Sequence, residues 1–220
     1  KPENILVAED GVNVKLIDFG NATFSGHQVY TYIQSRYYRA PEVLMGCYRH
    51  TQAGQQEPLY DASIDMWSLG CTAVELFIKM PIFPGRYDYD QMLKVLEFCG
   101  LPPFEYIRNS INEKKFFLYN HFQHCYIFKT FQQYCAAQPP QAAAWTLQPP
   151  TNYHQHHNFC QLLEHEYILK LKRAAYDEAL QDKMPVPPRF DQMNIQYGKR
   201  EQHRIFQFVD FVSQILQVDP

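Results

Sequence analysis

The chain has 220 residues, of which 46% are hydrophobic and 15% aromatic, and this is enough apolar material for one sizeable folded core. Its formal net charge of −3 argues against direct binding to nucleic acid or to an anionic membrane surface. No apolar run approaches the roughly 18 residues of a membrane span, and the six cysteines lack a Cys-x-x-Cys pair, which favours reduced thiols inside the cell.

The N-terminal part of the sequence has the pattern of a β-hairpin. A short apolar run at Ile5–Val7 and a β-branched run at Val12–Ile17 flank a turn that contains an Asp-Gly pair. Because a hairpin returns the chain on itself, Asn4 and Asp18 are predicted to lie side by side at one end. Their oxygens suit Mg2+, which takes few ligands from protein and leaves the rest to water and phosphate. Lys1 supplies a positive charge for a phosphate bound nearby.

Four short motifs follow one another in a characteristic order. They are Lys1-Pro2-Glu3-Asn4, Asp18-Phe19-Gly20, Ala40-Pro41-Glu42 and Asp65-Met66-Trp67-Ser68-Leu69-Gly70. In this order they resemble the protein kinases, whose catalytic loop runs His-Arg-Asp-x-Lys-x-x-Asn and whose metal-binding triplet is Asp-Phe-Gly. The resemblance implies a mainly α-helical fold, namely the large lobe of a protein kinase with a short β-hairpin at the catalytic cleft and no small lobe.

The same resemblance implies a function. A protein of this type uses ATP and Mg2+ to phosphorylate Ser or Thr in protein substrates. Lys1, Asn4 and Asp18 are then the residues that serve catalysis and bind the nucleotide, with Asn4 and Asp18 as the metal ligands. Glu42 and Asp65 are implied to be structural anchors.

An irregular polar stretch from Asn21 to Ala40 contains several tyrosines and arginines. From Tyr30 onward it resembles the dual-specificity tyrosine-regulated kinases of the CMGC group, with the homeodomain-interacting and pre-mRNA-processing kinases as near relatives. This resemblance implies that Tyr32 is autophosphorylated and that Arg36 and Arg39 clamp its phosphate. It also implies that Arg39 shapes a pocket for a proline after the target residue. The alternative is that these are ordinary loop and packing residues.

Two helices are predicted in the middle of the chain. Apolar residues wrap nearly the whole of the helix predicted over Asp61–Met80, which indicates burial on every side. Asp65 near its start is suited to accept backbone N–H groups and, by resemblance, anchors the catalytic loop. An amphipathic helix is predicted over Asp90–Cys99, with Gly100 as its stop. Residues 46–60 have the composition of a surface loop, longer than in most relatives.

The family signal fades from Phe104 to about Gln202, where kinases of this group carry a specific insert. Gln132–Asn158 is rich in Gln, Ala, Pro and His, so a loop or a partly disordered segment is predicted there. Its histidines lack acidic or cysteine partners at metal-binding spacing. Helices are predicted over Leu162–Leu180 and Ile205–Val218. The expected divisions are a kinase portion at 1–103, the insert at 104–202 and a late large-lobe helix at 203–220.

The resemblance also has gaps. The Gly-rich loop, the strand lysine, the His-Arg-Asp and the arginine expected to pair with Glu42 are missing from the sequence. Two interpretations remain open: a fragment of an intact kinase, inactive alone, or a non-catalytic scaffold that binds proteins. The retained Lys1, Asn4, Asp18 and Asp65 favour the fragment, because a scaffold does not require these residue types. The oligomeric state is left open, and the expected location is the nucleus, the cytoplasm or both.

Overall fold

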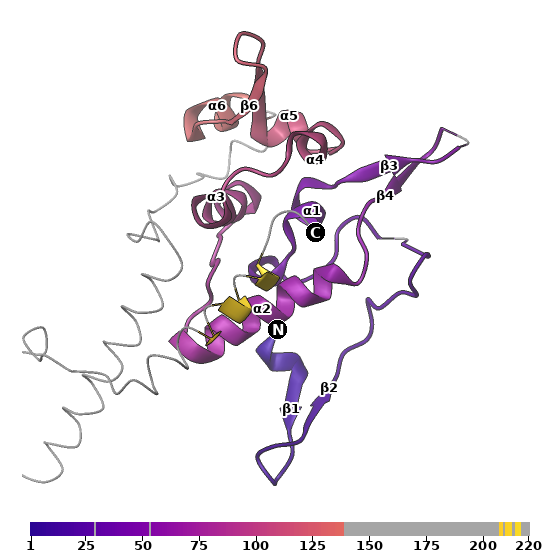
Figure 1. Ribbon diagram of the computed structural model, residues 1–220, viewed down its shortest axis with the longest axis vertical. Coiled ribbons are helices and arrows are strands. Elements are labelled where there is room, and N and C mark those ends of the chain that lie inside the picture. Colours follow the sequence, from indigo (N-terminus) through magenta and orange to yellow (C-terminus); the bar gives the residue numbers. More distant parts are fainter. Residues whose placement is uncertain (29, 53, 139–206, 209, 213, 217–220) are drawn as a thin grey trace, which may run out of the picture.

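The structure is a computed structural model that describes residues 1–28, 30–52, 54–138, 207–208, 210–212 and 214–216. Figure 1 shows α2 (Ser63–Ile78) at the centre, with the hairpin of β1 (Ile5–Val7) and β2 (Val14–Leu16) on one side and the elements from α3 onward on the other. In chain order, the remaining elements are η1 (Pro2–Asn4), η2 (Arg36–Tyr38), α1 (Pro41–Met45), β3 (Tyr48–His50), β4 (Gln56–Pro58), α3 (Asp88–Cys99), α4 (Phe104–Arg108), α5 (Glu113–Phe116), β5 (Phe117–Asn120), β6 (Cys125–Phe128) and α6 (Phe131–Ala136).

The predicted N-terminal hairpin is confirmed. β1 and β2 pair in antiparallel register, from Ile5 opposite Leu16 to the end of both strands. At the turn the Asp10 carboxylate accepts two backbone N–H groups, from Val12 and Asn13, at 2.9 Å each. These two hydrogen bonds lower the pKa of Asp10 and fix the tight turn that the Asp-Gly pair predicted.

The central helix α2 lies inside the predicted range 61–80. Trp67, Cys71 and Val74 on one side are at most 3% exposed. On the opposite side Met66 and Leu76 are 48% and 57% exposed. The prediction of burial on every side is therefore wrong for the described part of the chain, because its neighbouring elements pack against only one side of the helix.

The main core forms where α2 meets α3 and the described helical residues 207–208, 210–212 and 214–215. A Cβ on Gly70 would lie 2.8 Å from the Ile215 side chain, so this glycine permits the close approach of the last helix. The Phe77 and Phe208 rings stack with centroids 4.9 Å apart. α3 begins two residues before the predicted start and ends at the predicted Gly100, whose φ is 82°. The helix predicted near the C-terminus is confirmed where the structure describes it.

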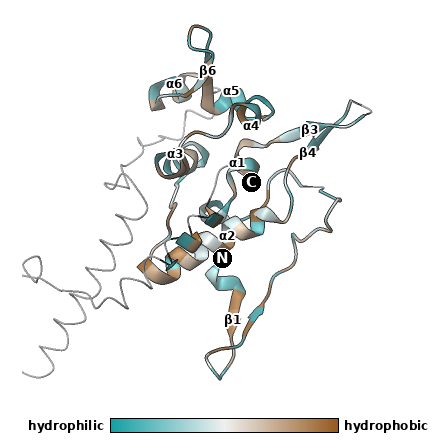
Figure 2. Ribbon diagram, in the orientation of Figure 1, coloured by the Kyte–Doolittle hydropathy of each residue, from teal (hydrophilic) through white to brown (hydrophobic). Residues whose placement is uncertain are grey.

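Residues 46–60 form a hairpin, β3–β4, and the prediction of a loop is wrong. β3 and β4 pair in antiparallel register, from Tyr48 opposite Pro58 to His50 opposite Gln56. The hairpin also meets a segment that is distant in sequence: Tyr48 N donates to Asn109 O at 2.9 Å, and Cys47 forms a β-bridge with Ser110. Composition alone does not contain this partner. Figure 2 shows the mainly hydrophilic and neutral colouring of the β3–β4 hairpin beside the hydrophobic stretches of α2 and β1.

The first part of the insert forms a second core around an aromatic cluster. Its buried members are Tyr89, Phe116, Phe117, Tyr126 and Tyr134. α6 occupies the start of the predicted loop, so the prediction is wrong there. A capping box of Thr130 and Gln133 begins this helix, and a prediction from composition alone did not take this motif into account.

The remaining predictions for the insert lie outside the described residues. These are the rest of the low-complexity stretch, its histidines and the helix over Leu162–Leu180. Within the part that the structure describes, no helix combines the length and apolar character that a membrane span requires.

Candidate active site

The hairpin brings the two predicted metal ligands together. Asn4 Nδ2 lies 3.4 Å from Asp18 Oδ2, and Ile17 N donates to Asn4 O at 3.0 Å at the open end of the hairpin. Asp18 has φ of 66°, a left-handed conformation that ends the strand and turns its carboxylate toward Asn4. The predicted juxtaposition is confirmed. The donor set fits Mg2+, because a carboxylate and an amide lie together and reorientation of the amide presents its oxygen.

Lys1 stands at the entrance to η1, where its carbonyl accepts a hydrogen bond from Asn4 N at 3.0 Å. Its side chain is exposed, as is the Asp18 carboxylate. Lys1 is therefore on the same end of the hairpin as Asn4 and Asp18, and its role toward a phosphate stays a prediction.

The structure places Tyr32 directly on Arg39. The Arg39 guanidinium carbon lies 4.0 Å from the centroid of the Tyr32 ring, a cation–π contact, and the tyrosine is 66% exposed. Arg36 does not share this contact, since its Nη1 donates to the Arg86 carbonyl at 2.7 Å. Its buried Nε has no hydrogen-bond partner within the described part of the chain. Only one of the two predicted phosphate-binding arginines thus contacts the tyrosine in this structure.

Arg39 also donates hydrogen bonds to the backbone of Ile33 and Gln34. Its Nε donates to Ile33 O and its Nη2 to Gln34 O, both at 2.9 Å. Gln34 has φ of 65°, unusual for a residue with a side chain, so the arginine captures the carbonyl of a strained residue.

The Gln34 side chain fixes the same conformation, and sequence reasoning missed this residue. Its Nε2 donates to Ile64 O and to Ser68 Oγ at 2.8 Å each, while its Oε1 accepts from Ala40 N at 2.9 Å. These partners lie 6 to 34 positions away. No local pattern in the sequence signals them.

The Glu75 carboxylate lies against the tyrosine that precedes Arg39. Tyr38 Oη donates to Glu75 Oε2 at 2.6 Å, from a position that is 6% exposed. Burial first, then the hydrogen bond and charge of Glu75 and the charge of Glu3, raise the pKa of the Tyr38 hydroxyl. The phenol therefore stays protonated and remains a donor to Glu75. Neither glutamate was identified as a site residue from the sequence.

The two predicted structural anchors differ in their surroundings. Glu42 is buried in α1, and burial, followed by the charge of Asp61, raises the pKa of its carboxyl to about 7. Asp65 is exposed in the first turn of α2, but the carboxylate that accepts a backbone N–H there is Asp61, from Ser63 N at 2.7 Å. The expectation that the Asp65 carboxylate accepts such groups is not met among the described residues. Its link to a catalytic loop stays a prediction.

The profile of the protein kinase domain family matches residues 1–220, the whole chain. With the hairpin that joins Asn4 to Asp18 and the turn held by Arg39, this match defines the class of the molecule. The chain belongs to the protein kinase family.

Within that family it is related to the dual-specificity tyrosine-regulated kinases of the CMGC group. It is 44% identical over 118 residues to human dual specificity tyrosine-phosphorylation-regulated kinase 4, covering 53% of this chain and 21% of that protein. It is 46% identical over 117 residues to the Saccharomyces cerevisiae dual specificity protein kinase YAK1, covering 53% and 13%. It is 43% identical over 118 residues to the Schizosaccharomyces pombe serine/threonine-protein kinase ppk15, covering 53% and 20%. The matched region is thus at most 21% of the length of these three relatives.

Proposed function

We propose that this chain is the large-lobe portion of a CMGC protein kinase that transfers the γ-phosphate of ATP to Ser or Thr followed by proline. The observation that carries the proposal is the turn at Gln34, whose carbonyl is held by Arg39. The family match and the Asn4–Asp18 pair support phosphate transfer, and the turn supports the choice of substrate.

The nucleotide site would use the end of the N-terminal hairpin. Asn4 and Asp18 would hold Mg2+, and Lys1 would neutralise charge on the transferred phosphate. When bound, Mg2+ neutralises the charge that develops on the phosphates. The protein residues position the reacting groups and stabilise charge, which is the main contribution that a kinase makes to catalysis.

The preference for proline follows from hydrogen bonding. By resemblance to the kinases, the stretch from Asn21 to Ala40 is the activation segment, along which substrates dock. A peptide that lies along it presents backbone N–H groups, and each buried N–H needs an acceptor. Arg39 occupies the Gln34 carbonyl, so a substrate N–H beside this turn would have no acceptor there. Proline has no backbone N–H, and it would therefore be accepted at this position without that penalty.

A preference for basic residues has separate support. Glu75 is half-buried beneath Tyr38, and Glu3 lies near enough to influence the same hydroxyl. A half-buried carboxylate such as that of Glu75 favours an arginine side chain, which can bind it through several N–H groups. We propose that substrates carry an arginine before the phosphorylated residue.

Tyr32 is the proposed site of autophosphorylation. The exposed tyrosine already stacks on a buried guanidinium, and a phosphate would add close to two negative charges beside it. Arg36, whose Nε lacks a hydrogen-bond partner, is the second candidate donor. The expected phosphate contacts would order residues 30–39. Active enzyme whose Tyr32 is unmodified by mass spectrometry would overturn this step.

The alternative function is a non-catalytic scaffold that binds proteins. Exposed apolar residues on β1, β2 and α2 are compatible with it, because apolar surface of this kind commonly marks an interface. The same surfaces are where the rest of a kinase domain would pack. We favour the kinase, in which the exposed apolar surface packs against the rest of the domain and the isolated chain is inactive. The reason is that the Asn4–Asp18 geometry serves no purpose in a scaffold.

Two observations separate these functions. A coding sequence with His-Arg-Asp-x in frame before Lys1 supports the kinase, whereas unrelated sequence there supports the scaffold. Binding of Mg-ATP to the isolated chain, measured by calorimetry, is expected to be weak, and tight binding would contradict the proposal. An intracellular site of action, in the nucleus, the cytoplasm or both, is proposed from the unpaired cysteines and would be tested by imaging the tagged protein.

A further inference from the structure

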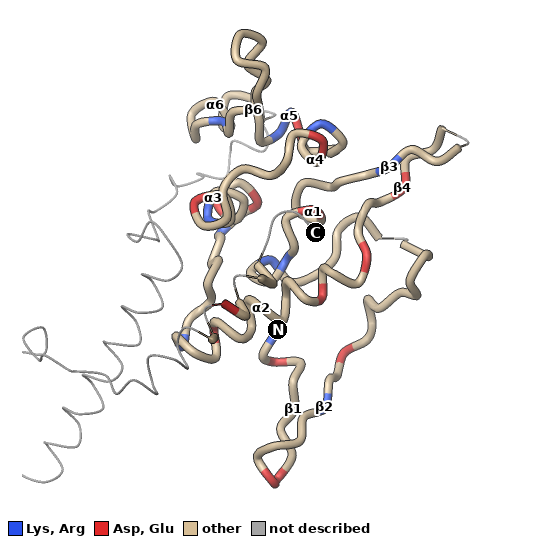
Figure 3. Tube along the Cα trace, viewed as in Figure 1, with Lys and Arg blue, Asp and Glu red and all other residues tan. Residues whose placement is uncertain are grey.

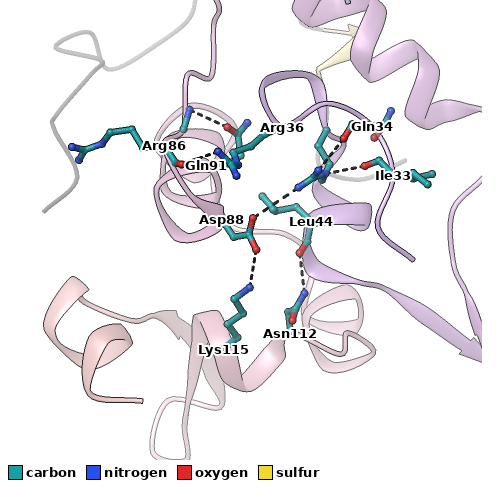
Figure 4. Close-up of polar contacts among 11 residues, drawn as sticks. Ile33, Gln34, Arg36, Leu44, Arg86, Asp88, Gln91, Asn112 and Lys115 are labelled. Carbon is teal, nitrogen blue, oxygen red and sulfur yellow. Dashed lines mark hydrogen bonds and ion pairs between the residues drawn. The ribbon is translucent and has the colours of Figure 1, made fainter. Parts of the chain in front are cut away.

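Asp88, the first residue of α3, lies between two cations from distant parts of the chain. Its Oδ2 accepts a hydrogen bond from Lys115 Nζ at 2.9 Å, and its Oδ1 lies 3.9 Å from Arg39 Nη1 (Figure 4). The second distance is too long for a hydrogen bond. The aspartate therefore accepts a hydrogen bond from Lys115 on α5, whereas its interaction with Arg39 in the activation segment is electrostatic only.

Loss of the Asp88 charge would destabilise Arg39 more than Lys115, because Arg39 is buried. The Arg39 side chain is 4% exposed, and its buried Nη1 has no hydrogen-bond partner among the residues that the structure describes. Asp88 is the one carboxylate that forms an ion pair with Arg39 in the described ranges. A buried guanidinium that loses its counter-ion is strongly destabilised, whereas Lys115 is 30% exposed and is hydrated in its absence. Figure 3 shows charged residues gathered on α3 and on the insert beside it.

The aspartate has room to move between its partners. A cavity of about 150 Å³ is lined by Arg39, Asp88 and Asn112, together with apolar residues of α1. A water molecule takes about 30 Å³, so this space can accommodate rotation of a carboxylate without displacing packed side chains. Free space beside Asp88 is therefore available for a closer approach to Arg39 when the hydrogen bond to Lys115 is removed.

We propose that Asp88 is a positioning residue that holds Arg39 against the turn at Ile33–Gln34, and that Lys115 weakens this hold by competing for the carboxylate. The proposal rests on the proposed function, in which that turn selects proline. The insert then contributes to substrate choice through one side chain. Arg39 keeps the Gln34 carbonyl from accepting a substrate N–H. When Arg39 is held more tightly against this carbonyl, the preference for proline is therefore stricter.

The competition predicts effects of opposite sign for two variants. Lys115→Met frees Asp88 to hydrogen-bond to Arg39, and the selectivity for proline rises. Asp88→Asn removes the counter-ion, and the selectivity falls. Loss of structure alone would lower the selectivity in both variants. Lys114→Met is the matched control, because it removes the same charge from an exposed neighbour on α5.

The experiment uses two readouts. In the intact kinase, kcat/KM is measured for paired peptides with proline or alanine after the target serine. The ratio is expected to rise about twofold to fivefold in Lys115→Met and to fall by a similar factor in Asp88→Asn, as for a partly exposed ion pair. In the 220-residue chain, hydrogen exchange of residues 33–40 is measured by mass spectrometry, with slower exchange expected for Lys115→Met and faster exchange for Asp88→Asn.

The outcomes separate the inference from the proposed function. Opposite shifts in both readouts, with Lys114→Met like the wild type, support the proposal. Equal ratios and equal exchange in Lys115→Met and Lys114→Met overturn it. A wild-type enzyme that treats both peptides alike overturns proline selection, and the hydrogen exchange then decides by itself whether Lys115 competes for Asp88.

Discussion

Glu42 is predicted to destabilise the 220-residue chain at alkaline pH. It is 6% exposed and forms no ion pair with any residue in the described ranges, and its carboxyl has a pKa of about 7 in place of its ordinary 4.5. Glu42→Gln keeps the size of the side chain and removes the buried charge. At about 1.4 kcal/mol per pKa unit, this shift corresponds to about 3 kcal/mol. Above pH 7 the free energy of unfolding of Glu42→Gln should exceed that of the wild type by this amount.

The sign of the pH dependence follows from proton binding. Between pH 4.5 and about 7 the folded chain retains a proton on Glu42 that the unfolded chain has lost. The free energy of unfolding of the wild type therefore falls as the pH rises through this window, and it is steady above it. Glu42→Gln should lack this fall.

Urea unfolding at pH 5 and pH 8 measures the difference. Glu105→Gln is the matched control, because this glutamate is exposed on α4 and should show no comparable gain at pH 8. Wild-type stability that does not fall between the two pH values, or a Glu42→Gln variant that is less stable at pH 8, would refute the reasoning. Either result would mean that Glu42 has a cationic partner in the folded chain.

Two further predictions concern packing around α2. Gly70→Ala places a Cβ 2.8 Å from Ile215 Cγ2 and 2.9 Å from Leu216 Cδ2, so overpacking should lower the free energy of unfolding by about 1–3 kcal/mol, seen as a lower urea midpoint at unchanged slope. An unchanged midpoint would show that the last helix does not rest on Gly70. Tyr38→Phe removes the 2.6 Å hydrogen bond to Glu75 and should lower the stability by about 1 kcal/mol, measured by thermal unfolding. A variant as stable as the wild type would contradict the importance of this contact.

The N-terminal hairpin shows how much of the site could be predicted from sequence. Its strands are adjacent in the chain, and an Asp-Gly turn joins two short apolar runs, so local pattern was sufficient to pair Asn4 with Asp18. The same holds for the end of α3, where Gly100 adopts the positive φ that stops a helix. The hairpin and the helix end could be predicted from the sequence because residues close together in the chain determine both.

Features that depend on distant partners were not. Gln34 adopts its left-handed conformation because its side chain bonds to Ile64, Ser68 and Ala40, and a sequence does not show which of these will meet. The hydrogen bond from Tyr48 N to Asn109 O likewise joins segments that are distant in the chain. The exposed side of α2 was mispredicted because periodicity reports which residues are apolar, and not which neighbours cover them. Tertiary contacts decided each of these cases.

Phosphate transfer by the intact protein tests the central claim most directly. The assay measures incorporation of the ATP γ-phosphate into a peptide with serine followed by proline, for the wild type, Asp18→Asn and Asp10→Asn. The account predicts activity in the wild type, a loss of at least about 100-fold in Asp18→Asn, and wild-type activity in Asp10→Asn, whose side chain caps the far turn of the same hairpin. Transfer by Asp18→Asn at the wild-type rate, or none by the intact wild type, would contradict it.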